Sequence, residues 1–224
     1  MVTDRRRYPE SAGQDGLERL ILDAGRAARA GVDLIQVRER GLDDRALLTL
    51  LRRMASACDG SRALLLVNRR VDVALAAGAA GVHLPAASPS AARVREIVPS
   101  GFVIGRSVHS AEEAEAVERA GGCDYLVFGT VYPSAGKPAG HVSAGVEGLR
   151  RACGAVTLPV LAIGAIVPAR VREIAAAGAA GIAAVGLFIT TQEEDDARQA
   201  EGTIAARVAD VRRAFDEAGA VSLE

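Results

Sequence analysis

The chain has no tryptophan, and aromatic residues make up only 3% of its 224 residues, although half of all residues are apolar. Its interior must therefore be built mainly from Ala, Val, Leu and Gly, which suits helices packed closely on strands. A chain of this length can bury the core of one large α/β domain.

The chain also lacks an excess of charge of either sign and a long uninterrupted apolar run. The formal net charge is -1, which gives no reason to expect a nucleic-acid or membrane-surface partner. The apolar stretch over residues 71–84 is interrupted by Asp72 and Gly78 and is too short to span a bilayer. The N-terminus is basic but lacks the apolar segment of a secretory signal.

Cysteine is scarce as well. Cys58, Cys123 and Cys153 are odd in number, widely spaced and without the pairing typical of metal ligands. We interpret them as reduced structural thiols of a cytoplasmic protein.

A short unit recurs along the chain: an Ala-rich stretch, a Gly, and then an apolar run rich in β-branched residues. Gly supplies the left-handed residue that closes a helix before the chain turns into a strand. The unit occurs at residues 28–35, 76–84, 119–127 and 177–185, and further strand-like runs occur at residues 2–4, 63–68, 102–108 and 157–164. The sequence therefore predicts eight strands.

Helical patterns separate these strands. The predicted helices cover residues 16–30, 43–58, 71–77, 90–98, 111–120, 144–153, 168–177 and 194–218. Eight β/α units without a linker favour a single (β/α)8 TIM barrel over residues 1–224. An open doubly wound sheet is the alternative, but no Gly-rich dinucleotide motif follows the first strand. That strand begins almost at Met1, so either the barrel tolerates a stub or the natural start lies upstream.

Polar residues at the end of the second predicted strand suggest an anion site, because TIM barrels carry their chemistry where strands end. Gln36, Arg38 and Arg40 have the same parity and would share one face of the strand. Two guanidinium groups and an amide suit a phosphate or pyrophosphate. The alternative is a local ion pair between Arg38 and Glu39 without any ligand.

The next three strand ends each offer one candidate group. Asn68 could donate to a ligand oxygen or cap the helix that follows. His83 lies in an apolar strand, where a histidine is more often a hydrogen-bonded core residue than a catalyst. Ser107 could face the ligand, whereas His109 is expected to shape its loop.

The last three strand ends suggest phosphate binding. The apolar strand at residues 124–128 leads into a loop with the hydroxyl of Ser134 and the amine of Lys137, which suit an anion. Small residues at the seventh and eighth strand ends let backbone N–H groups approach a phosphate. These residues are Gly164, Ala165, Gly186 and Leu187.

Taken together, these residues resemble the thiamine phosphate synthase/TenI family over residues 2–188. The segments that carry the resemblance are Gln36-Val37-Arg38-Glu39-Arg40, Val67-Asn68 with Val71-Asp72-Val73-Ala74-Leu75, Gly81-Val82-His83-Leu84 and Ala162-Ile163-Gly164. The resemblance implies a (β/α)8 barrel, in agreement with the spacing of the predicted strands.

The resemblance implies one of two activities. The synthase joins a pyrimidine pyrophosphate to a thiazole phosphate and loses pyrophosphate through a cation-like pyrimidine, with magnesium holding the leaving group. TenI-type proteins convert the thiazole phosphate to its aromatic tautomer, which needs an acid/base group but no metal.

Two departures from the synthase pattern concern the metal. Arg69 and Ser88 stand where the resemblance would place two metal-binding Asp residues. Their loss should remove most of the affinity for a hard cation, whereas Arg69 could bind a phosphate directly. We therefore expect no cofactor and no metal site, with magnesium needed only if the chain is a synthase. Segments 84–85, 104–110 and 126–129 look closer to TenI.

One departure concerns the acid/base group. Thr130 stands where TenI-type proteins carry their catalytic His, so His83 or His141 would have to act instead. Our leading hypothesis is a TenI-type protein that binds thiazole phosphate, either as a tautomerase or as a diverged relative. The alternatives are a working synthase and a non-catalytic binder of a thiamine-pathway phosphate. The sequence leaves open whether the chain forms a homo-oligomer.

Overall fold

The computed structural model describes residues 1–8, 16–133, 143–190 and 197–221. These residues group into two compact units, each made of two chain segments. Unit 1 comprises Met1–Val82 and Val185–Asp210, and unit 2 comprises His83–Ala184 and Val211–Glu224. The single domain expected over residues 1–224 stays a prediction.

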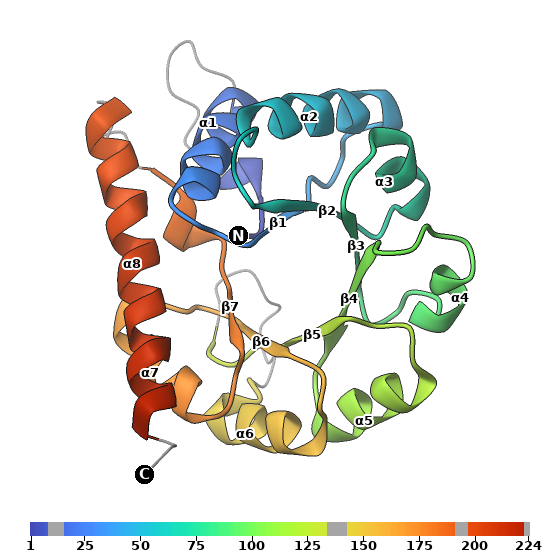
Figure 1. The fold of residues 1–224 in the computed structure, drawn as a ribbon, viewed down its shortest axis with the longest axis vertical. Coiled ribbons are helices and arrows are strands. Elements are labelled where there is room, and N and C mark those ends of the chain that lie inside the picture. The colour runs from blue at the N-terminus through green and yellow to red at the C-terminus, as the bar shows by residue number, and fades with distance from the viewer. Residues whose placement is uncertain (9–15, 134–142, 191–196, 222–224) are drawn as a thin grey trace. The chain divides into compact units, whose positions relative to one another are not determined.

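Unit 1 contains a parallel pair of strands with helices between them. Strands β1 (Leu34–Val37) and β2 (Leu64–Asn68) pair in parallel, with Gln36 opposite Leu66. In Figure 1, α1 and α2 lie side by side. The other elements of this unit are η1 (Arg5–Arg7), α1 (Gly16–Arg29), α2 (Asp44–Ala57), α3 (Val71–Ala77), η3 (Gly186–Phe188) and the first part of α8 (Ala197–Val221).

Unit 2 contains four parallel strands that pair in chain order. They are β4 (Val103–Val108), β5 (Tyr125–Phe128), β6 (Val160–Ile163) and β7 (Gly181–Ala183). The helical elements between them are α5 (Ala111–Ala120), α6 (Gly145–Ala155), η2 (Pro168–Arg170) and α7 (Val171–Ala176), and α4 (Ala91–Arg95) precedes β4. Strand β3 (Gly81–Leu84) lies at the boundary between the two units.

The regular alternation of strand and helix confirms the predicted α/β fold (Figure 1). Strands β3 and β5 are buried along their whole length, as expected of parallel strands covered on both faces. The predicted helix start at Ser110 is also confirmed, because its side chain accepts a hydrogen bond from the Glu113 N–H. Gly78 closes α3 with a left-handed φ of 65°.

Three predicted elements differ from the structure. The strand expected at residues 2–4 is only a single parallel bridge between Val2 and Gln36, because Asp4 already caps η1 by accepting from the Arg6 N–H. The described residues therefore form seven strands rather than eight. The helix expected at residues 168–177 opens as a 3-10 turn at Pro168, and the one expected at residues 90–98 ends at Arg95.

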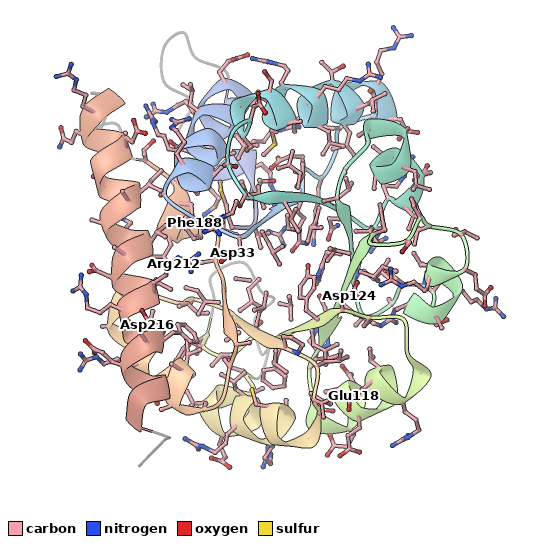
Figure 2. All side chains as sticks on the ribbon, in the orientation of Figure 1. Asp33, Glu118, Asp124, Phe188, Arg212 and Asp216 are labelled. Carbon is pink, nitrogen blue, oxygen red and sulfur yellow. The ribbon has the colours of Figure 1, made fainter. Side chains whose placement is uncertain are left out.

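Two carboxylates of unit 2 fix the entries to its strands. Asp124, just before β5, accepts from the Ile104 N–H at 2.6 Å and from the Arg95 guanidinium at 2.6 Å (Figure 2). Glu118 on α5 accepts from the backbone N–H groups of Thr157 and Leu158 ahead of β6. These bonds satisfy backbone donors where the ladder has not yet begun.

No helix among the described residues has the length and apolar character needed to cross a membrane.

A buried carboxylate holds unit 1 together. Asp23 on α1 is fully buried, and its oxygens accept from the Tyr8 hydroxyl at 3.0 Å and from the Thr190 N–H at 2.9 Å. The Arg26 guanidinium donates to the same carboxylate at 2.9 Å and supplies the opposite charge. Asp23 therefore ties the N-terminal segment and the segment after η3 to one helix.

We predict that Asp23→Ala lowers the free energy of unfolding by about 3–5 kcal/mol, because it leaves the Arg26 cation and three buried donors, one from Tyr8 and two from Thr190, without their acceptor. Chemical denaturation monitored by circular dichroism measures this change. Glu201→Ala is the control, since Glu201 forms an exposed ion pair with Arg29 and should contribute about 0–1 kcal/mol. Equal effects of the two substitutions would contradict the prediction.

Candidate functional site

Five polar residues lie at or just beyond the carboxyl ends of β1 and β2, and we call them the strand-end cluster. They are Gln36, Arg38, Arg40, Asn68 and Arg69. Gln36 is buried, and its amide Nε2 donates to Oδ1 of Asn68 at 3.0 Å. Helix α3 has no side-chain cap, so the alternative of Asn68 as a helix cap is wrong.

Arg38 is the most constrained member of the strand-end cluster. Its N–H donates to the Thr3 hydroxyl at 2.9 Å, which fixes the backbone just beyond β1. Its Nε is buried without a hydrogen-bond partner among the described residues. Burial lowers the pKa of the guanidinium, and the neighbouring charge of Arg40 lowers it further. Arg38 is therefore a cation whose surroundings do not fully compensate it.

The carboxylate nearest Arg38 comes from the N-terminal segment. Asp4 Oδ2 lies 3.6 Å from Nη2 of Arg38, but both Asp4 oxygens are already bound by the Arg6 side chain at 2.8 and 2.9 Å. Glu39 instead accepts two bonds from the Arg5 N–H, and burial raises its pKa. The alternative of a local ion pair between Arg38 and Glu39 is therefore wrong.

The remaining cations of the strand-end cluster are exposed. Arg40 and Arg69 make no hydrogen bond or ion pair with the described residues. Arg69 has a left-handed φ of 69°, which is uncommon for a residue with a side chain. Arg70 differs, since its guanidinium pairs with Asp44 and Asp72.

Gly186 and Leu187 open the 3-10 turn η3 in unit 1. The Arg207 guanidinium from α8 donates to the carbonyl oxygens of Leu187 and Ile189 at 3.3 and 3.2 Å. The Thr190 N–H, bound by Asp23, anchors the residues that follow. The predicted phosphate loop is thus held from two sides by side chains.

In unit 2 the structure brings together two predicted residues. His83 is 2% exposed, and its Nε2 lies 2.8 Å from Oγ of Ser107 on β4. Its Nδ1 lies 3.2 Å from the hydroxyl of Tyr125, the first residue of β5. We call His83, Ser107 and Tyr125 the His83 group.

Sequence reasoning missed Tyr125. Gly105 lies opposite Tyr125 in the β4–β5 register, and a Cβ atom at Gly105 would lie 2.0 Å from Cζ of the ring. The missing side chain therefore makes room for the phenol that reaches His83. The sequence carries no direct signal for this contact, because it depends on the β4–β5 register that sets Gly105 opposite Tyr125.

The strand ends after β5 and β6 are packed against each other. Thr130 is buried, and its carbonyl accepts from the Ala144 N–H at 2.9 Å. A Cβ atom at Gly164 would lie 2.4 Å from Cγ2 of Thr130, so only glycine fits there. Ala165 follows with a φ of 44°, and its carbonyl accepts from the Arg170 guanidinium.

Three predicted residues lie outside the described residues: Ser134, Lys137 and His141. His109 has the local role expected of it, since its N–H and its Nδ1 both contact the Glu113 carboxylate.

The geometry supports two kinds of chemistry. The strand-end cluster offers guanidinium and amide donors to an anion, with one buried donor atom still unused. The His83 group joins an imidazole to two hydroxyls and can hold or relay a proton.

Comparisons with known proteins agree with one another. The family model described as thiamine monophosphate synthase matches residues 8–188. A thiamine-phosphate synthase of Methanoculleus marisnigri is 40% identical over 164 residues, which cover 73% of this chain and 77% of the relative. A thiamine-phosphate synthase of Chlorobium limicola is 33% identical over 206 residues, which cover 92% and 89%.

A solved structure extends this likeness to the fold. The thiamine phosphate pyrophosphorylase from Pyrococcus furiosus is similar with a TM-score of 0.74 at 32% identity, covering 94% of each chain. The family match, the relatives and the solved structure point the same way: this chain belongs to the thiamine monophosphate synthase family.

Proposed function

We propose that this chain is a thiamine phosphate synthase, which joins a pyrimidine pyrophosphate to a thiazole phosphate. In this reaction the bond between the pyrimidine methylene carbon and the pyrophosphate oxygen breaks, and pyrophosphate leaves with the electron pair. The thiazole nitrogen then bonds to the cation-like methylene carbon and yields thiamine phosphate.

The comparisons favour this activity over the TenI-type reading suggested by the sequence. The relatives reported above carry the name of the synthase, and none carries that of a tautomerase. The TenI-type expectation rested on short segments and on Arg69 and Ser88, whereas the relatives match most of the chain. The synthase is therefore our main proposal.

The observation that carries the proposal is the guanidinium of Arg38, which is only partly compensated by Asp4 and belongs to a side chain that is 28% exposed. In the proposed reaction the accessible part of this guanidinium donates to a pyrophosphate oxygen and stabilises the charge that grows as the leaving group departs. Gln36 in β1 and Asn68 in β2 are hydrogen-bonded to each other, and their amide groups are proposed to contact the substrates. Arg40 and Arg69 add positive charge for the pyrophosphate.

The His83 group is proposed to orient Ser107. Burial raises the pKa of Tyr125, so the phenol keeps its proton. Its hydroxyl donates a hydrogen bond to Nδ1 of His83. With Nδ1 accepting from Tyr125, the imidazole donates from Nε2 to Ser107 Oγ, which leaves the Ser107 proton for a substrate oxygen or nitrogen.

Other sequence expectations remain part of the proposal. Backbone N–H groups of Gly164 and Ala165 in unit 2 and of Gly186 and Leu187 in unit 1 are candidate donors to the thiazole phosphate, and Ser134, Lys137 and Thr130 stay predictions. Closure of the sheet into an eight-stranded TIM barrel is proposed from the seven parallel strands and the Val2–Gln36 bridge. A homo-oligomeric state stays a prediction.

A direct assay tests the proposal. Purified chain is incubated with both substrates, once with magnesium chloride and once in EDTA, and thiamine phosphate and released pyrophosphate are measured by mass spectrometry. We expect equal amounts of the two products. Absence of both at saturating substrate would overturn the proposal.

A second candidate function is binding of the thiazole phosphate without condensation. It is favoured by Arg69 and Ser88, which replace two acidic residues that the resemblance associates with turnover. Calorimetric binding of thiazole phosphate, together with no product in the assay, would select this function.

We predict that Arg38→Gln lowers kcat/KM about 10- to 100-fold, the range for loss of a hydrogen bond to a charged group. Because burial disfavours the charge of Arg38, the same substitution should leave the melting temperature unchanged or raise it. Arg45→Gln, on the exposed face of α2, is the control for loss of a positive charge. Unchanged kcat/KM in Arg38→Gln would rule out its role in binding.

We also predict that Tyr125→Phe and Ser107→Ala are coupled, because both act through His83. Each single variant should lower kcat, and the double variant should lose less activity than the sum predicts, by about 0.5–3 kcal/mol. Steady-state kinetics of the four proteins measures this coupling. Additive losses would show that His83 does not connect the two hydroxyls.

A further inference from the structure

We infer that the strand-end cluster binds pyrophosphate directly through guanidinium groups and needs no divalent metal ion. This inference rests on the proposed function, and it departs from the magnesium that the resemblance implies. The inference depends on whether the residues at the two expected metal-ligand positions could bind a hard cation. Such a cation takes oxygen ligands and prefers carboxylates.

The first expected ligand position does not fit a cation. Arg69 directly follows Asn68 at the end of β2, and its exposed guanidinium brings a positive charge where a carboxylate would be needed. The next residue, Arg70, is paired with Asp44 and Asp72, so the charge that faces a ligand here is that of Arg69. A guanidinium repels a metal ion and attracts an anion.

The second expected position does not fit either. Ser88 lies in the turn after β3, and the carbonyl oxygens of this turn already accept hydrogen bonds from Arg106 on β4. The Arg106 guanidinium donates to Ala86 at 2.8 Å, to Ser88 at 3.0 Å and to Pro89 at 2.7 Å. Ser88 has no carboxylate to offer a cation, and the guanidinium of Arg106 places a positive charge against this turn.

The acidic residues near the strand-end cluster are engaged elsewhere. Asp4 is held by both arms of the Arg6 side chain, and Asp44 and Asp72 are held by Arg70. Glu39 accepts from the backbone of the N-terminal segment. Over the residues the structure describes, no group of three or more metal-binding side chains occurs. The donor set of unit 1 is therefore cationic rather than acidic.

The same residues suit pyrophosphate. Arg40 and Arg69 have no partner among the described residues, and Nε of Arg38 is buried without one. A guanidinium presents several N–H donors in one plane and can bind two phosphate oxygens at once, which a metal ion would otherwise bridge. Arg69 is thus proposed to take the place of the metal.

Isothermal titration of the full chain with inorganic pyrophosphate tests this inference. The titration is run once in EDTA and once in excess magnesium chloride at equal ionic strength. We expect binding in EDTA with an affinity within about threefold of that in magnesium. Binding only in magnesium would overturn the inference.

Arg69→Gln identifies the residue responsible. In EDTA it should weaken pyrophosphate binding roughly tenfold or more, as expected for a lost hydrogen bond to a charged group. Arg62→Gln is the matched control, since Arg62 precedes β2 at its opposite end and carries the same charge. Equal affinities of the two variants, both folded by circular dichroism, would show that Arg69 does not replace the metal.

The inference and the proposed function fail in different ways. Pyrophosphate binding in EDTA without any thiamine phosphate in the assay supports the inference and overturns the synthase proposal. Thiamine phosphate formed only with magnesium, together with pyrophosphate binding only with magnesium, supports the synthase and overturns the inference.

Discussion

A half-buried guanidinium without a full set of partners is the constraint on which the proposed site depends. Arg38 is fixed by its backbone bond to Thr3, and its Nε is shielded from water. Asp4 approaches only to 3.6 Å and is already held by Arg6. A charge in such surroundings is unfavourable unless an anion joins it. The incompletely paired positive charge of the strand-end cluster therefore indicates an anionic ligand.

Local features of each unit keep the candidate groups in place. In unit 1, Asp23 and Arg207 hold the turn that carries Gly186 and Leu187. In unit 2, the absent side chain of Gly105 admits the Tyr125 ring, whose hydroxyl bonds to His83. Both arrangements fix candidate groups through side-chain hydrogen bonds within their own unit. Binding groups on rigid elements need little reordering when a ligand arrives.

The sequence predicts the order of helices and strands well, because glycines and apolar runs mark the boundaries locally. It predicts the face shared by Gln36 and Arg38 from strand parity, but the nearness of Asp4 to Arg38 depends on how the N-terminal segment pairs with β1. The prediction of a strand at residues 2–4 was wrong for a similar reason, since the cap at Asp4 ends the pairing early. The sequence did not predict the role of Tyr125, because its contact with His83 depends on the strand register that sets Tyr125 opposite Gly105.

A crystal structure of the full chain with pyrophosphate and thiazole phosphate tests the central claim most directly. The account predicts a pyrophosphate oxygen about 2.7–3.0 Å from a guanidinium nitrogen of Arg38, a normal distance for a charged hydrogen bond. It also predicts the Arg69 guanidinium on the same anion with no metal between them. Pyrophosphate bound away from the strand-end cluster, or held there through a metal ion, would contradict the account.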